Sequence, residues 1–133
     1  MYRNTLVPIA YEAGHDANAE LEAARKLADP GARVTLLHVM DPVPFFAIDY
    51  MPEGYRGELE RAIQADLQRH ADQFDNGAVV VVEGDAAREI LEWAEVNGVD
   101  CIVLATHRSD TSLYGSTAAR VVRYAPCAVH LLR

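Results

Sequence analysis

One polar segment, residues 105–117, combines residue types that bind phosphate groups. It offers an imidazole, a guanidinium, a flexible glycine and two adjacent hydroxyls, and backbone N–H groups at a helix start add to these. The residues concerned are Ala105, His107, Arg108, Gly115, Ser116 and Thr117. The segment joins the apolar run 101–104 to the amphipathic stretch 118–124. A loop that leaves a strand and enters a helix is where open α/β sheets bind nucleotides, so we predict an anion or nucleotide site here.

Each of these residues also has a structural interpretation. Ser116 and Thr117 are residue types that cap helices throughout proteins. Arg108 could bind a phosphate through two parallel hydrogen bonds, or it could fill the pocket and exclude a nucleotide. His107 could orient a phosphate or simply hydrogen-bond to the backbone. These alternatives depend on side-chain directions, which the sequence alone does not give.

The sequence offers no pattern typical of a catalytic or metal site. Nucleotidyltransferases of similar fold use a His-x-Gly-His motif, whereas Glu12 and Ala13 precede Gly14-His15 here. The two cysteines, Cys101 and Cys127, lack metal-ligand spacing. We therefore expect no catalytic residues and no bound metal.

Strands and helices must alternate along the chain to position the polar segment. Five short apolar runs are typical of strands covered on both faces: 6–9, 34–39, 79–82, 101–104 and 128–132. Helical periodicity separates them, at residues 16–28, 58–74, 85–97 and from about 115 to 125. This alternation predicts a doubly wound α/β domain, a parallel sheet with helices on both faces.

The linker at residues 41–57 differs from the other connections. It holds three of the six prolines together with several aromatic residues. It therefore cannot be helical throughout, yet it is apolar enough that we expect it to pack against the domain. Either it is a flap that covers one edge, or it forms a lid or wall of a ligand pocket.

Length and charge limit the classes of partner. A chain of 133 residues fits one domain, which we expect to span residues 1–133. The formal net charge of −8 disfavours nucleic acid and anionic membranes as partners. Residues 1–5 lead directly into the first apolar run without the pattern of a signal peptide, so we expect a cytoplasmic location.

Five segments in order carry a resemblance to a known family. They are Asn4-Thr5-Leu6-Val7-Pro8-Ile9, Gly31-Ala32-Arg33-Val34-Thr35-Leu36-Leu37-His38-Val39, Gly84-Asp85 with Ile90, Gly98-Val99-Asp100-Cys101-Ile102-Val103-Leu104, and Gly115-Ser116 with residues 121–129. Together they resemble the universal stress protein family. The pair His107-Arg108 and Tyr114 are more similar to its enterobacterial F/G-type branch. The resemblance implies an adenine nucleotide alpha hydrolase-like fold with a five-stranded sheet in the order 3-2-1-4-5. It also implies homodimers that pair through the last strand, here Ala128 to Leu132.

The resemblance also suggests how the nucleotide site differs here. ATP-binding members carry Gly-x-x-Gly, nine residues, then Gly-Ser or Gly-Thr. The two leading glycines fall on Ala105 and Arg108, and six residues separate Arg108 from Gly115, so the loop is degenerate and shortened. Members that hold adenine usually carry an aspartate where Ala10 stands. Backbone groups of Ile9 and Val39 could still contact the adenine edge.

From this resemblance we expect a noncatalytic, homodimeric stress-response protein that binds ATP or AMP, with Mg²⁺ only if ATP binds. The expected contacts are Pro8, Ile9, Ala10, Val39, Ala105, His107, Arg108, Gly115, Ser116 and Thr117. One alternative keeps the fold as a nucleotide-free module for dimerisation or docking to an unidentified protein partner. A third is a nucleotide hydrolase or transferase that uses the same crevice.

Overall fold

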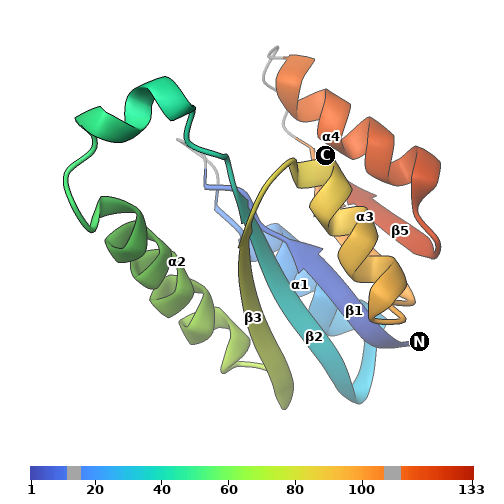
Figure 1. Ribbon diagram of the computed structural model, residues 1–133. Helices are drawn as coiled ribbons and strands as arrows, with labels where there is room; N and C mark the ends of the chain where they lie inside the picture. The colour runs from blue at the N-terminus through green and yellow to red at the C-terminus, as the bar shows by residue number, and fades with distance from the viewer. Residues whose placement is uncertain (12–15, 107–111) are drawn as a thin grey trace.

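Strands and helices alternate along the whole chain, as the periodicity predicts (Figure 1). The computed structural model describes residues 1–11, 16–106 and 112–133. The strands are β1 (Tyr2–Pro8), β2 (Ala28–Met40), β3 (Asn76–Glu83), β4 (Cys101–Ala105) and β5 (Ala128–Leu132). The helices are α1 (Asn18–Leu27), the short 3₁₀ helix η1 (Phe45–Tyr50), α2 (Tyr55–Ala71), α3 (Ala86–Val96) and α4 (Ser112–Tyr124).

The five strands form one parallel sheet in the order β3-β2-β1-β4-β5. The predicted fold class and strand order are therefore confirmed. β1 lies at the centre, where Thr5 pairs with Val34 of β2 on one side and with Cys101 of β4 on the other. The chain leaves β1 in one direction to build β2 and β3, and later crosses to the other side to build β4 and β5. The carboxyl ends of β1 and β4 thus flank the point where the winding reverses.

Helices cover both faces of the sheet, as expected for strands that are buried on both faces (Figure 1). Leu21 of α1 and Leu67 of α2 pack with Leu36 in a core on one face. Ile90 of α3 and Val121 of α4 pack with other apolar residues of the sheet in a core on the opposite face. No helix in the described ranges is long and apolar enough to cross a membrane.

A cluster of hydrogen bonds aligns β1 with β4 at their amino ends. The Asp100 carboxylate accepts hydrogen bonds from the backbone N–H groups of Arg3 (2.9 Å) and Asn4 (3.0 Å). The Asn4 amide donates in turn to the Asn97 carbonyl at 2.8 Å. Because β1 and β4 are far apart in sequence, these contacts set the register of the strands whose opposite ends border the site described below.

Two helices begin earlier than the sequence predicts. The helix expected at residues 58–74 begins at Tyr55, directly after Gly54, whose φ of +80° suits glycine. The fourth helix was expected near Gly115-Ser116 but begins at Ser112. Ser112 is itself a residue type that favours helix starts, so the glycine was the wrong marker. The predicted start of α3 is confirmed, because the Asp85 carboxylate accepts from the backbone N–H of Arg88 at 3.1 Å.

The linker after β2 does not bury its aromatic residues. It rises from the end of β2, forms η1 and returns to the start of α2 (Figure 1). Phe45 and Tyr50 are 85% and 88% exposed, and Phe46 and Ile48 are exposed as well. The expectation that this segment packs its apolar side chains against the domain is therefore wrong. Its base, at Asp41, lines the pocket described below.

Candidate functional site

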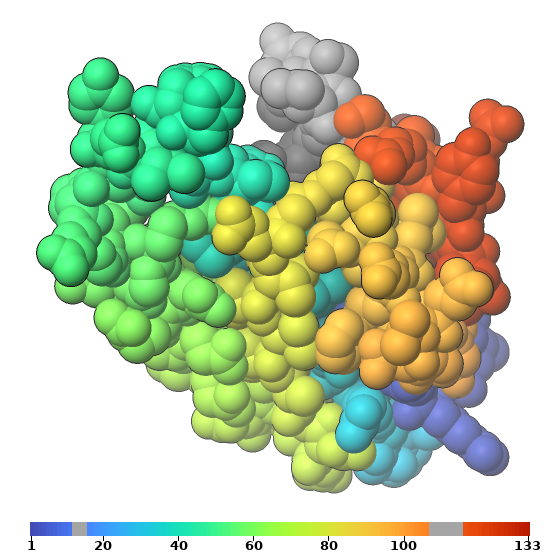
Figure 2. Space-filling view, viewed as in Figure 1, coloured from blue at the N-terminus to red at the C-terminus, as the bar shows by residue number. Residues whose placement is uncertain are grey.

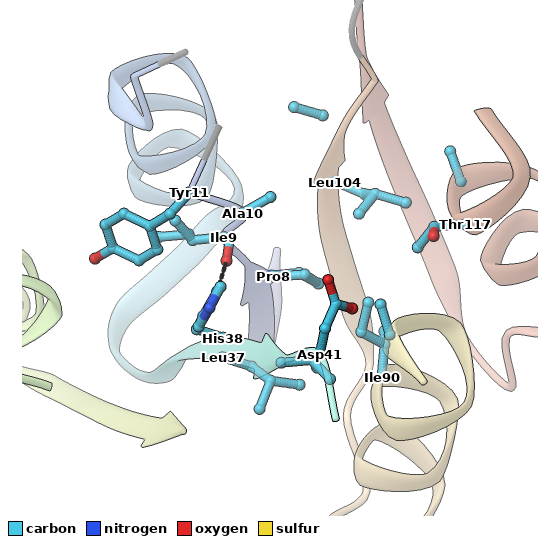
Figure 3. A pocket seen from close by; sticks show the side chains of 14 residues that line it. Pro8, Ile9, Ala10, Tyr11, Leu37, His38, Asp41, Ile90, Leu104 and Thr117 are labelled. Carbon is cyan, nitrogen blue, oxygen red and sulfur yellow. Dashed lines mark hydrogen bonds between the residues drawn. The ribbon is translucent and has the colours of Figure 1, made fainter. Parts of the chain in front are cut away.

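A pocket of about 270 Å³ opens at the carboxyl edge of the sheet, where the winding reverses. Its walls come from the ends of β1, β2 and β4 and from the facing sides of α3 and α4 (Figure 3). The lining residues are Pro8, Ile9, Ala10, Tyr11, Leu37, His38, Val39, Asp41, Ala86, Ile90, Leu104, Ala105, Thr117 and Ala118. Crevices at this point of a doubly wound sheet are the usual place where such folds bind ligands.

The floor of the pocket is apolar. Leu37, Ile90, Leu104 and Ala118 are all buried, and Pro8 lies beside them. These side chains belong to the core between the sheet and the helices α3 and α4, so their positions are fixed by packing. A rigid apolar surface of this kind suits a flat ring that is removed from water.

The backbone of Ile9 is already hydrogen-bonded. Its N–H donates to the Leu37 carbonyl at 2.8 Å. Its carbonyl accepts from Nδ1 of His38 at 2.7 Å, so Nδ1 carries the proton (Figure 3). The Ile9 N–H is thus not available to a ligand. Val39, by contrast, lies two residues beyond the last β1–β2 pair, Pro8 with Leu37, where none of the described strands pairs with that edge of β2.

Tyr11 connects the pocket wall to helix α2. Its ring packs edge-on against His38, with centroids 5.0 Å apart, and its hydroxyl donates to Oδ2 of Asp66 at 2.6 Å. Asp66 also forms an ion pair with Arg69. Burial, followed by the hydrogen bond and charge of Asp66, raises the pKa of Tyr11 well above its usual value. The Tyr11 hydrogen bond is the largest cause that lowers the pKa of Asp66.

The structure brings together six of the ten residues predicted from the sequence. The six that line the pocket are Pro8, Ile9, Ala10, Val39, Ala105 and Thr117. Gly115 belongs to α4, and Ser116, in the same helix, is not among the described residues that line the pocket. His107 and Arg108 lie outside the described residues. The sequence did not lead us to predict that Tyr11, His38 and Asp41 line the pocket. The available signal for Tyr11 and Asp41 was their position shortly after the ends of β1 and β2.

The earlier start of α4 changes the predicted phosphate contacts. Only the first four residues of a helix, here Ser112 to Gly115, have N–H groups without partners inside the helix. Ser116 and Thr117 follow them, so their N–H groups belong to the helical hydrogen-bond pattern. Thr117 therefore offers the pocket its side chain and not its backbone N–H.

Two further observations concern charge and metals. Nη1 of Arg120 in α4 lies 3.0 Å from Oδ2 of Asp85, the residue that caps α3, so the two helices that flank the pocket are linked.

Within residues 1–11, 16–106 and 112–133, no three His, Cys, Asp or Glu side chains come close enough together to hold a metal ion.

Comparison with known proteins gives consistent results. The model of the universal stress protein family matches residues 1–133. A universal stress protein of Methanothermobacter thermautotrophicus is 36% identical over 144 residues, covering 100% of this chain and 97% of that protein. The solved structure of the universal stress protein UspA from Lactobacillus plantarum is similar with a TM-score of 0.72 at 23% identity, covering 100% and 99% of the two chains. A universal stress protein family protein from Arabidopsis thaliana, solved with AMP bound, has a TM-score of 0.65 at 14% identity and coverages of 97% and 90%.

Proposed function

The chain belongs to the universal stress protein family, and from this premise we propose that it is a noncatalytic regulatory protein that binds an adenine nucleotide in the pocket at the carboxyl edge of its sheet. The ligand is AMP or ATP, and Mg²⁺ accompanies it only if it is ATP. Binding orders the residues around the pocket and so changes a surface that a protein partner contacts. The role is one in the stress response of the cytoplasm.

The observation that carries this proposal is the combination of a rigid apolar floor with polar groups at its rim. The floor of Leu37, Ile90 and Leu104 suits a purine ring. Thr117, on the α4 side, offers a hydroxyl where the phosphates of such a ligand enter. The Arabidopsis protein with AMP bound supports the choice of ligand class, because it shares this fold.

Arg108 and His107 complete the proposed phosphate site. A guanidinium at residue 108 binds a phosphate through charge, where other members use the backbone next to a glycine. We also propose that the chain is closer to the enterobacterial F/G-type branch of the family and that its ATP-binding loop is shortened. Both proposals rest on the sequence pattern of residues 105–117.

A homodimer that forms through β5 is the second part of the proposal. Among the described strands β5 lies at the edge of the sheet and pairs with β4, and Leu131 on it is 41% exposed. An apolar edge strand left bare pairs readily with another chain. Two copies that join at β5 cover this edge with the same surface on each side.

One observation favours a different function, a docking module that has lost its nucleotide. The segment η1 lies at the surface of the molecule (Figure 2), and its aromatic side chains Phe45, Phe46 and Tyr50 are exposed in the linker whose base, Asp41, lines the pocket. Exposed apolar surface of this kind marks contacts with other proteins. A nucleotide hydrolase or transferase is the remaining alternative, and steady turnover of ATP by the purified protein would indicate it.

The test is to denature the purified protein, separate the released small molecules by chromatography, and titrate the apo protein with AMP and ATP in a calorimeter. We expect a released or tightly bound adenine nucleotide without turnover. Ala10→Phe should fill the pocket and abolish binding, whereas Ala47→Phe places the same side chain on η1 and should leave binding intact. Absence of both released nucleotide and binding heat would favour the docking module.

A further inference from the structure

Among the described residues that line the pocket, Asp41 is the one with an acidic side chain. It follows the last residue of β2, Met40, at the base of the linker. Figure 3 shows its carboxylate directed into the pocket, between Pro8 and Ile90. Among the described residues, no hydrogen bond or ion pair to this carboxylate is formed, so its oxygens are open to a ligand.

The backbone of Asp41 is held from two sides. The N–H of Gly84 donates to the Met40 carbonyl at 3.0 Å. Nη2 of Arg56 donates to the Asp41 carbonyl at 2.6 Å, and the same nitrogen lies 3.7 Å from the Glu83 carboxylate. These contacts fix where the Asp41 side chain starts, although Asp41 and most of the segment that follows it are exposed. A group held in this way can select a ligand without first being ordered.

The position of Asp41 in the pocket identifies the part of a nucleotide that it meets. Thr117 and α4 lie across the apolar floor from Asp41 (Figure 3). If phosphates enter beside α4, the base extends over the floor towards Asp41 and Ile90. Ala10, two residues after the end of β1, has no side-chain acceptor, so among the described lining residues Asp41 is the carboxylate that remains for the base.

We propose that Asp41 selects adenine by accepting a hydrogen bond from its exocyclic amine; this inference rests on the proposed nucleotide function. An ionised carboxylate only accepts hydrogen bonds. The exocyclic amine of adenine is a donor, whereas hypoxanthine presents an acceptor oxygen at the same position and would be repelled. A base that cannot donate to this carboxylate loses the hydrogen bond, so the site discriminates against it.

The test compares adenosine with inosine, which differ in the group at C6 and in the proton on the neighbouring N1, and which carry no phosphate charge. Because Asp41 is exposed, solvent weakens this hydrogen bond, and we expect the wild-type protein to prefer adenosine by about threefold to tenfold. Asp41→Ala should lower adenosine affinity to the level of inosine. Asp41→Asn should bring the two affinities close together, since an amide both donates and accepts.

Asp49→Asn is the matched control, because it removes the same charge from an exposed residue of η1 outside the pocket. It should leave the adenosine-to-inosine ratio unchanged. If the wild-type protein binds adenosine but the Asp41 variants keep its affinity and its ratio, the role of Asp41 is overturned while the nucleotide function stands. If the wild-type protein binds neither adenosine nor AMP, both are overturned.

Discussion

Replacing Tyr11 with Phe removes one hydroxyl from the link between the pocket wall and helix α2. The lost contact is the 2.6 Å hydrogen bond to the Asp66 carboxylate. Hydrogen bonds to charged groups contribute about 1.5–3 kcal/mol, but Tyr11 is 45% exposed and solvent weakens the bond. We therefore expect Tyr11→Phe to lower the free energy of unfolding by about 1 kcal/mol at pH 7. For a domain of this size that corresponds to a fall in Tm of about 3–5 °C.

The effect of Tyr11→Phe should depend on pH at both ends of the scale. Folding lowers the pKa of Asp66. The stabilisation that this hydrogen-bonded carboxylate gives the folded state is therefore present above the unfolded carboxyl pKa of about 3.9, and it is lost as pH falls through the folded pKa. The pKa of Tyr11 is raised by folding, so its contribution is present below about pH 10 and is lost as pH rises further. The difference between wild type and variant should therefore be flat between about pH 5 and 9 and shrink outside that range.

Urea denaturation followed by circular dichroism, at a series of pH values, measures this difference. Tyr50→Phe is the matched control, because the Tyr50 side chain is 88% exposed. It should behave as the wild type at every pH. A Tyr11→Phe protein as stable as the wild type at pH 7, or one whose deficit grows on acidification, would refute this account.

Three further outcomes follow from the structure. Gly77→Ala should lower the free energy of unfolding, measured by urea denaturation, by about 1–3 kcal/mol, because the new Cβ would lie 2.1 Å from the Ala71 carbonyl oxygen. Gly57 lies inside α2, and a Cβ there would meet only the end of a flexible arginine side chain. Gly57→Ala should therefore raise the free energy of unfolding by about 0.5–1 kcal/mol. Burial raises the pKa of the Cys101 thiol to about 11, so iodoacetamide at pH 8 should modify it only after denaturant is added, as mass spectrometry would show. Leu131→Lys should convert the proposed dimer to a monomer in light scattering, and an unchanged mass would place the interface elsewhere.

The layout of the sheet could be predicted because its signals are local or shared with a family. Short apolar runs identified the strands, and the resemblance supplied the strand order. Residues at strand ends then fell into the pocket together, as Pro8 and Ala105 do. The carboxyl edge of a parallel sheet collects such residues whatever their side chains are.

The rest could not be predicted because it depends on groups that meet only in space. Tyr11 owes its fixed position to Asp66, on a helix far along the chain. The Ile9 N–H appeared available in the sequence but is used by the Leu37 carbonyl. The start of α4 was misplaced because both Ser112 and Gly115-Ser116 resemble helix starts, and propensity alone does not choose between them.

The central position of β1 has a consequence for how the chain folds during synthesis. β1 can pair with β2 as soon as residue 40 is made, but its other edge waits for β4, because Thr5 pairs with Cys101. Until then a nascent chain exposes an apolar strand edge, the kind of surface that promotes aggregation. The pocket is also incomplete until Thr117 has emerged. A ligand of this pocket can thus stabilise the finished protein, but it cannot guide the early steps of folding.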